Sequence, residues 1–167
     1  GRRDEIEAER IHADVARFVS DSIDEEFTEV LFNSEEIRKE SEDGYPFMLD
    51  IEDLGRGVVK TIPVYTAVEL LEPTLTIWDD VESSLHPTLL ESLVEWLVDA
   101  PTQAVLSSHS IDVITAVLQA DVDSVSFLSV RTEDGTLHVE EYDQDELRKI
   151  VENAGHDPRY LPVSTDG

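Results

Sequence analysis

The sequence has no cysteine, so disulfide bonds and thiolate metal sites are excluded. Basic residues are also scarce, with twelve lysines and arginines in 167 residues, and the only lysines are Lys39, Lys60 and Lys149. A nucleic-acid-binding surface needs clustered lysine and arginine to contact phosphates. No basic patch is visible here, and direct nucleic-acid binding is therefore disfavoured.

Long hydrophobic runs are absent as well. No apolar stretch approaches the roughly 18 residues of a membrane span, and the N-terminal Gly-Arg-Arg-Asp-Glu is not followed by a signal-peptide core. These absences predict a cytoplasmic protein without a membrane partner. The length and the 40% apolar content fit one globular domain with a substantial core.

Acidic residues are abundant: 39 aspartates and glutamates give a formal net charge of −27. They are spread from Asp4 to Asp166, so an acidic tail explains them poorly. We favour a solvated acidic surface of the kind found in halophilic proteins, because the Debye length falls to about 3 Å at molar salt and self-repulsion is then screened. The excess of arginine over lysine also resembles haloarchaeal proteins. The alternative is a nucleic-acid mimic, whose carboxylates imitate phosphates.

The hydrophobic pattern predicts an α/β fold. Apolar residues from Asp4 to about Asn33 recur at three- and four-residue steps, which indicates one or two amphipathic helices. Strands and helices then alternate, which implies βαβ crossovers and a parallel sheet. The expected strands are 45–51, 75–79, 103–107 and 122–130, and the expected helices are 58–71, 87–99 and 110–119.

The C-terminal part predicts a hairpin and a helix. Asp134 and Gly135 fit a tight turn that joins 125–131 to 137–142. A last helix is expected from Asp145 to Asn153. We therefore predict three parts: a helical segment (1–44), an α/β subdomain (45–155) and a tail (156–167).

Chemically distinctive residues lie at the ends of two predicted strands. The run 75–82 reads Leu-Thr-Ile-Trp-Asp-Asp-Val-Glu and ends in Asp79, Asp80 and Glu82, while Ala104 to Leu106 lead to His109. A buried strand that delivers carboxylates at its C-terminal edge suits Mg²⁺ beside a nucleotide. Adjacent acids on an extended segment point to opposite sides, so one would orient the ion and the other would face water.

Two further features accompany these strands. Gly55 and Gly57 bracket Arg56 before a helix, and a helix N-terminus with flexible backbone is a natural anion site. His109 is followed by Ser110, a predicted helix N-cap, and its ring is placed to approach a phosphate. Each feature also has a purely structural interpretation: acids that cap a helix, a histidine at a strand end, a simple turn. His86 precedes Pro87 and fits a helix entry equally well.

The order of these features resembles the C-terminal half of an ABC-type P-loop ATPase, in particular the OLD-family nucleases and related AAA-type proteins. The order is a glycine turn, an acid-ended strand, Leu85-His86-Pro87 and a histidine-ended strand. The resemblance spans about positions 45 to 130. It implies Asp79 as the Walker B carboxylate for Mg²⁺, Asp80 and Glu82 as catalytic carboxylates and His109 as the switch histidine. Gly55, Arg56 and Gly57 would be the signature turn, which meets the ATP of a partner subunit in a homodimer.

Three departures from that family pattern stand out. Position 80 is Asp where the family usually has Glu, and the signature turn lacks the common Ser-Gly pair. No Gly-x-x-x-x-Gly-Lys-Ser/Thr loop, which would cradle the phosphates, occurs in the sequence. The chain therefore resembles the C-terminal portion of a longer ATPase, whether a truncated piece, a split gene product or a degenerate descendant. The second hypothesis for function is a non-catalytic acidic interaction or DNA-mimic module that retains the fold.

The acidic composition generates a prediction about stability. The melting temperature should rise strongly between dilute buffer and molar KCl, because salt screens the repulsion among the carboxylates. Thermal unfolding followed by circular dichroism across this range tests it. An unchanged melting temperature would contradict the halophilic interpretation.

Overall fold

The computed structural model describes residues 11–153, except 24, 42, 121, 123 and 124. The tail predicted from residue 156 lies outside this range. The chain divides into two compact units, Gly1–Ala116 and Val117–Gly167.

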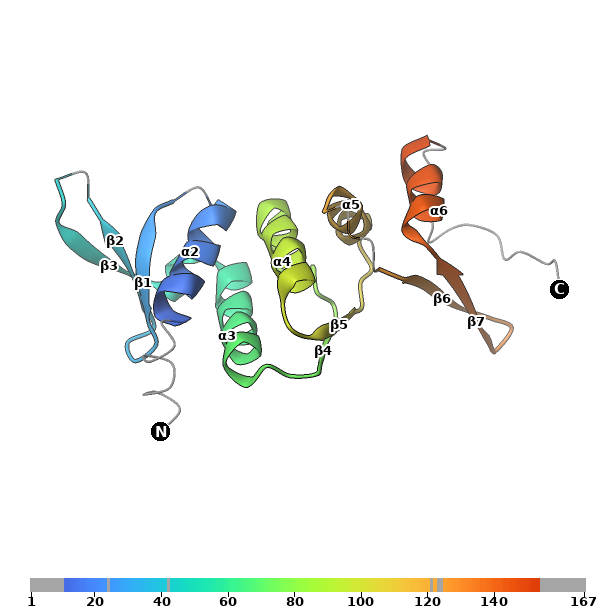
Figure 1. Ribbon diagram of the computed structural model, residues 1–167, viewed down its shortest axis with the longest axis horizontal. Coiled ribbons are helices and arrows are strands. Elements are labelled where there is room, and N and C mark those ends of the chain that lie inside the picture. The colour runs from blue at the N-terminus through green and yellow to red at the C-terminus, as the bar shows by residue number, and fades with distance from the viewer. Residues whose placement is uncertain (1–10, 24, 42, 121, 123–124, 154–167) are drawn as a thin grey trace. The chain divides into compact units, whose positions relative to one another are not determined.

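The first described element of this unit is a helix packed on an antiparallel sheet (Figure 1). Helix α2 (Ile11–Ile23) buries Val15, Phe18 and Val19. The sheet has the order β1-β2-β3, with β1 at Phe27–Leu31, β2 at Glu36–Glu40 and β3 at Pro46–Asp50. Val30 of β1 and Ile37 of β2 pair in register and are fully buried, so they supply the apolar contact beneath the helix.

The prediction of helix as far as Asn33 is wrong after Ile23, because Phe27–Leu31 form β1. The register of β1 against β2 shifts between Phe27 and Glu29. A bulge adds one residue to the strand, and Phe27 and Val30 both become buried at a spacing of three. This spacing imitated the helical period in the sequence. Strand β2 was not predicted, because Ile37 is its single apolar residue.

A short connection leads from the sheet into the longest helix. The 3₁₀ turn η1 (Ile51–Leu54) is capped by Asp50, whose carboxylate accepts from the Glu52 N–H at 3.0 Å. Helix α3 (Arg56–Leu71) starts directly after Gly55, which has φ 99°. That backbone conformation favours glycine. The predicted strand at 45–51 and helix at 58–71 are present, but β3 pairs antiparallel with β2 and does not belong to the parallel sheet in which it was expected.

The α/β prediction with a parallel sheet is confirmed by the next three elements. Strands β4 (Leu75–Trp78) and β5 (Gln103–Leu106) pair in parallel, and α4 (Pro87–Asp99) connects them. Helix α5 (Ile111–Gln119) follows β5, and Ser110 caps it by accepting from the Asp112 N–H at 3.1 Å. The carboxyl ends of β4 and β5 lie at the same edge, as the register Trp78 to Leu106 requires.

One face of this two-stranded sheet is bare. Ile77 is 72% exposed, and Leu75 and Val105 on the same face are also exposed. Trp78, which points to the other face, is buried. Parallel sheets are normally covered by structure on both faces. The exposed face is therefore suited to further packing.

The second unit contains the predicted hairpin. Strands β6 (Phe127–Glu133) and β7 (Thr136–Tyr142) are antiparallel and are joined through Asp134 and Gly135, both with positive φ. The strand predicted at 122–130 begins only at Phe127 among the described residues. Helix α6 (Gln144–Arg148) begins with a capping box formed by Asp143 and Glu146, and continues into a π-helical turn, η2 (Lys149–Asn153).

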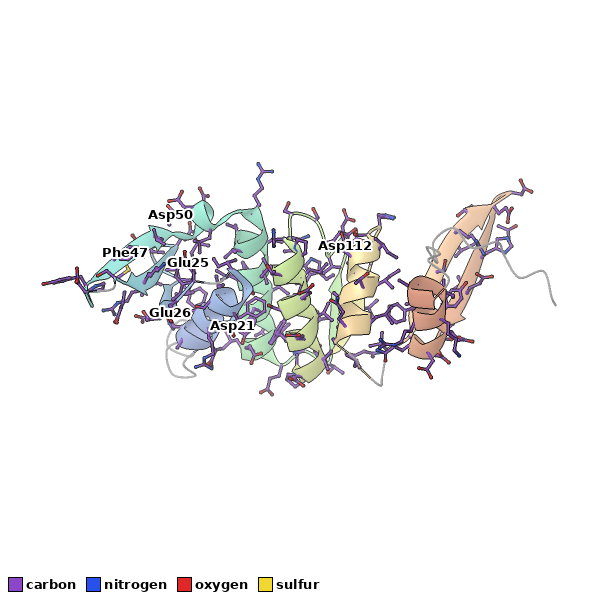
Figure 2. The ribbon with its side chains drawn as sticks, turned by 90° about the horizontal axis from the view of Figure 1, so that it is seen from above. Asp21, Glu25, Glu26, Phe47, Asp50 and Asp112 are labelled. Carbon is purple, nitrogen blue, oxygen red and sulfur yellow. The ribbon has the colours of Figure 1, made fainter. Side chains whose placement is uncertain are left out.

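Acidic side chains are exposed on several elements of the first unit. Figure 2 labels five of them, all exposed: Asp21, Glu25, Glu26, Asp50 and Asp112. Within the described residues, no helix is both long and apolar enough to cross a membrane. The acids are thus arranged as a solvated surface rather than as one local cluster.

The close approach of α3 to the loop before α4 generates a stability prediction. A Cβ at Gly57 would lie 2.6 Å from the Ser84 backbone oxygen and 3.2 Å from a Leu89 methyl group. Gly57→Ala should therefore lower the free energy of unfolding by about 1–3 kcal/mol, although alanine normally stabilises a helix. Val59→Ala, at an exposed position of the same helix, should change it by less than about 0.5 kcal/mol. Urea denaturation measures both, and a more stable Gly57→Ala protein would contradict the close contact.

Candidate functional site

The predicted acids follow β4 directly. Asp79 and Asp80 are both exposed, and Asp80 has φ 56°, which places it in the left-handed region. The prediction that the two acids lie on an extended segment with opposed side chains is therefore wrong: the strand ends at Trp78 and the chain turns at Asp80. Such a conformation is uncommon for a residue other than glycine and often marks functional sites.

Ser107, the residue after β5, holds this turn in place. Its N–H donates to the Trp78 carbonyl at 2.9 Å, and its own carbonyl accepts from the Val81 N–H at 3.1 Å. Its hydroxyl donates to Asp79 Oδ1 and accepts from the Asp80 N–H at 3.0 Å. Ser107 therefore contacts four successive residues: it holds the Asp79 carboxylate and fixes the backbone at Asp80. The sequence analysis did not single it out, although its position at the end of a strand was a usable signal.

Glu82 and His109 are brought together. Glu82 Oε1 accepts from the His109 backbone N–H at 2.8 Å. Burial acts to raise the pKa of Glu82, but hydrogen bonds from its own N–H, from the His109 N–H and from the Ser108 hydroxyl, with the charge of His109, outweigh it and hold the pKa below its usual range. Glu82 is thus a carboxylate that links the loops after β4 and β5.

The second oxygen of Glu82, Oε2, is buried, and no described residue donates to it with hydrogen-bond geometry. Buried acceptors of this kind usually have a partner. No group of three or more histidine, aspartate or glutamate side chains among the described residues is arranged to hold a metal. Mg²⁺, however, usually takes only one or two carboxylates and completes its shell with phosphates and water, so these acids fit it.

The first turns of α3 contact the loop after β4 that carries Asp79 and Asp80. Lys60 Nζ donates to the Asp80 carbonyl at 2.9 Å and lies 5.5 Å from the centre of the Trp78 ring. Gly57 packs against the backbone at Ser84 and Leu85. Arg56 is exposed, and no described residue forms an ion pair with it. The predicted glycine turn therefore lies next to the predicted acids, with an unpaired guanidinium at its start.

His86 is a helix-entry residue, the structural interpretation considered for it above. It is the N-cap of α4, and its Nδ1 accepts from the Thr88 N–H at 3.4 Å. Pro87 occupies the first turn, as expected for a proline at this place.

The lowered pKa of Glu82 generates a prediction about acid stability. A depressed pKa in the folded state stabilises the protein above the unfolded pKa, near 4.5, and this contribution is lost as the pH falls through the lower folded value. Glu82→Gln should therefore destabilise the protein at pH 7, and its difference from the wild type should shrink between about pH 5 and pH 3. Urea denaturation at each pH measures the difference. Glu91→Gln, on the exposed side of α4, controls for the loss of one surface carboxylate, and a Glu82→Gln effect independent of pH would contradict the assignment.

A family model matches residues 4–115, about two thirds of the chain, and its description is "AAA domain, putative AbiEii toxin, Type IV TA system". No curated protein matches the chain. Among solved structures, one match is a chain from structural work on ATP-driven dimerization and DNA-stimulated activation of SMC ATPases. It has a TM-score of 0.63 and 13% identity, over 94% of this chain and 99% of that one.

Two archaeal Smc head domains are also similar in fold. The one from Pyrococcus furiosus, with an extended coiled coil and the C-terminal domain of ScpA bound, has a TM-score of 0.55 and 15% identity over 88% of this chain. The one from Pyrococcus yayanosii, with a coiled coil and joint, has a TM-score of 0.56 and 12% identity over 89% of this chain. This chain spans only 38% and 29% of their respective lengths. The parallel sheet and its flanking helices thus have a P-loop NTPase fold similar to that of SMC ATPase heads. By the family match, the chain belongs to the AAA-domain family with that description.

Proposed function

We propose that this chain is the C-terminal part of an ABC-type ATPase, similar to the OLD family, that binds and hydrolyses Mg-ATP. The observation that carries the proposal is the cluster at the carboxyl ends of β4 and β5. There Ser107 orients Asp79 and Asp80, and Glu82 bonds to the backbone of His109. Ligands of open α/β sheets bind at this edge.

Asp79 is the metal carboxylate in this proposal. It is exposed, and the Ser107 hydroxyl holds one of its oxygens, which leaves the other available to Mg²⁺ or to a water in its shell. Bound there, Mg²⁺ would neutralise charge on the β- and γ-phosphates.

Asp80 is the general base. Its backbone is held on both sides, by Ser107 at the N–H and by Lys60 at the carbonyl. Its carboxylate is exposed and accepts no hydrogen bond from a described residue. A carboxylate in this position is open to contact with an attacking water.

Glu82 is better suited to positioning than to proton transfer, because its lowered pKa makes it a weak base. Through its bond to the His109 N–H, it fixes the loop from which the His109 ring reaches towards a γ-phosphate. A ring N–H at that place donates to the charge that develops on the phosphate oxygens.

In this proposal, the phosphate loop and a second subunit complete the active site. The phosphate loop is absent from the sequence, and the bare apolar face at Leu75, Ile77 and Val105 offers a surface on which the half that carries it can pack. The glycine turn with Arg56 would meet the ATP of a second subunit, so that nucleotide is held between two copies.

We also propose a high-salt origin for the protein. The acidic side chains are exposed on many elements, and such a surface keeps a protein soluble at ionic strengths where its self-repulsion is screened.

Activity measurements test the proposed function. The chain alone should bind ATP weakly and release no phosphate. Together with the polypeptide that carries the phosphate loop, it should hydrolyse ATP, and Asp79→Ala should abolish this activity. Asp80→Asn should lower kcat by about 10²–10⁴-fold while ATP binding survives. Asp43→Asn, an exposed aspartate of the β2–β3 turn, is the matched control and should leave kcat unchanged.

Other outcomes would revise these roles. Steady hydrolysis by the chain alone, abolished by Asp79→Ala, would mean that it contains a phosphate site of another kind. Normal hydrolysis by Asp80→Asn together with an inactive Glu82→Gln would make Glu82 the base. Asp80→Glu should speed turnover if the shorter side chain limits the rate, since a misplacement of about 1 Å can cost about 10²-fold.

A further inference from the structure

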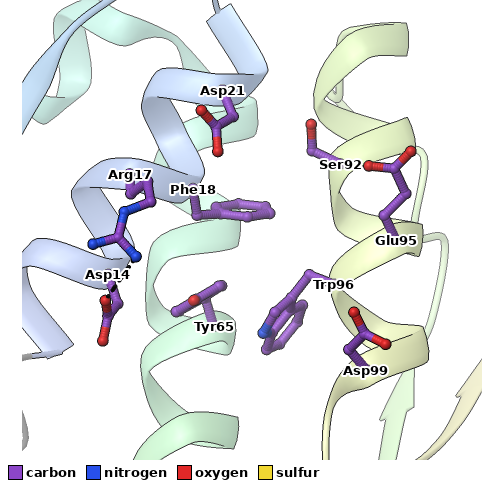
Figure 3. A pocket seen from close by; sticks show the side chains of 9 residues that line it. All are labelled: Asp14, Arg17, Phe18, Asp21, Tyr65, Ser92, Glu95, Trp96 and Asp99. Atoms are coloured by element: carbon purple, nitrogen blue, oxygen red, sulfur yellow. Dashed lines mark ion pairs between the residues drawn. The ribbon is translucent and has the colours of Figure 1, made fainter.

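A hollow of about 280 Å³ lies between α2 and α4 (Figure 3), and none of the acids that follow β4 lines it. Its walls are formed by residues of α2 and α4, and Tyr65 of α3 contributes to its floor. Nothing in the proposed ATPase chemistry uses these residues.

The floor of the hollow is aromatic. Phe18 from α2 and Trp96 from α4 point towards each other, with Tyr65 beside both (Figure 3). Tyr65 stacks on Trp96 with ring centres 4.6 Å apart, and Phe18 lies 4.9 Å from Tyr65 and 6.1 Å from Trp96. Aromatic π-systems attract cations, most strongly where water is excluded.

The rim of the hollow is negatively charged. Four carboxylates line it, those of Asp14, Asp21, Glu95 and Asp99. Arg17 is the single basic residue among the lining residues, and its guanidinium is already 3.3 Å from Asp14. Three carboxylates therefore face the hollow without a cation among its lining residues.

Tyr65 adds an uncharged polar group to the lining of the hollow. The side chain is only 9% exposed, yet no described residue forms a hydrogen bond with its hydroxyl. Burial first, and then the charges of Glu69 and Asp14, raise the pKa of Tyr65 to about 12, so the hydroxyl stays neutral. The Tyr65 oxygen is not one of the fully buried side-chain atoms without a partner among the described residues, so it is open to the hollow. The neighbouring polar atom shows the contrast, because Trp96 Nε1 donates to Glu69 at 2.7 Å.

We propose that the hollow is a binding site for a guanidinium group. A planar guanidinium lies against aromatic rings and carries five N–H donors in a fixed fork. These donors match carboxylates on both walls and the oxygen of the Tyr65 hydroxyl, and charge-assisted bonds of this type are the strong ones. The group comes either from an arginine side chain of a protein partner or from a free guanidino compound.

Four probes separate these sources and test the charge requirement. Two are small: N-acetyl-arginine methylamide and its neutral counterpart N-acetyl-citrulline methylamide. Two are alanine-rich nine-residue peptides with arginine or citrulline at the centre. Isothermal titration calorimetry against the full chain at low salt gives each affinity. We expect both arginine probes to bind and both citrulline probes to bind at least tenfold more weakly. Tighter binding of the peptide than of the amide assigns the site to a protein partner, and equal binding assigns it to a free compound.

Variants localise the binding. Tyr65→Phe keeps the ring and removes the hydroxyl, and should weaken arginine binding by about fivefold to tenfold. Asp21→Asn with Glu95→Gln should weaken it further, whereas Glu91→Gln, one turn from Glu95 and outside the hollow, should leave it unchanged. Melting curves confirm that each variant is folded. The proposal is overturned if neither arginine probe binds, if citrulline binds equally well, or if the hollow variants bind as the Glu91→Gln protein does.

Discussion

Ser107 is the residue on which the geometry of the site depends. Its backbone continues the parallel ladder from Trp78 to Val81, and its hydroxyl bonds to Asp79 and to the Asp80 N–H. A turn with a left-handed aspartate costs of order 1–3 kcal/mol and persists only where its surroundings hold it. Here two backbone bonds, one hydroxyl and the Lys60 ammonium on the Asp80 carbonyl hold it. The backbone of the loop that carries the acids is therefore fixed by the protein itself.

The same loop is held from its other side by α3 and α4. Gly57 lets the backbone of α3 approach Ser84 and Leu85 more closely than any other residue would allow. His86 and Pro87 then start α4, and Thr88 reaches back to the Ser22 carbonyl of α2 at 2.8 Å. Direct contacts therefore link the glycine turn, the loop that carries the acids, and α4.

Charge is distributed differently in the two sites. At the ends of β4 and β5, Asp79 and Glu82 accept hydrogen bonds from a hydroxyl and a backbone N–H, while the Asp80 carboxylate accepts none from a described residue. Around the hollow, three of the four carboxylates form no ion pair with another lining residue, and the floor is aromatic. In a protein with a net charge of −27, an acidic residue carries little information by itself. The neighbours of each carboxylate decide whether it is part of a solvated surface or of a site.

Local sequence determined much of this protein. The apolar runs at 75–78 and 103–106, the proline at the start of α4 and the Asp134-Gly135 turn predicted their elements because the relevant forces act within a few residues. The bulged strand β1 was mistaken for helix, since a bulge converts the period of two into a spacing of three. Strand β2 was missed because Ile37 is buried only once α2 and β1 cover it. The left-handed turn at Asp80, the Ser107 bridge and the meeting of Phe18, Tyr65 and Trp96 were decided by tertiary structure alone, because each joins residues more than twenty positions apart, and no local pattern records such contacts.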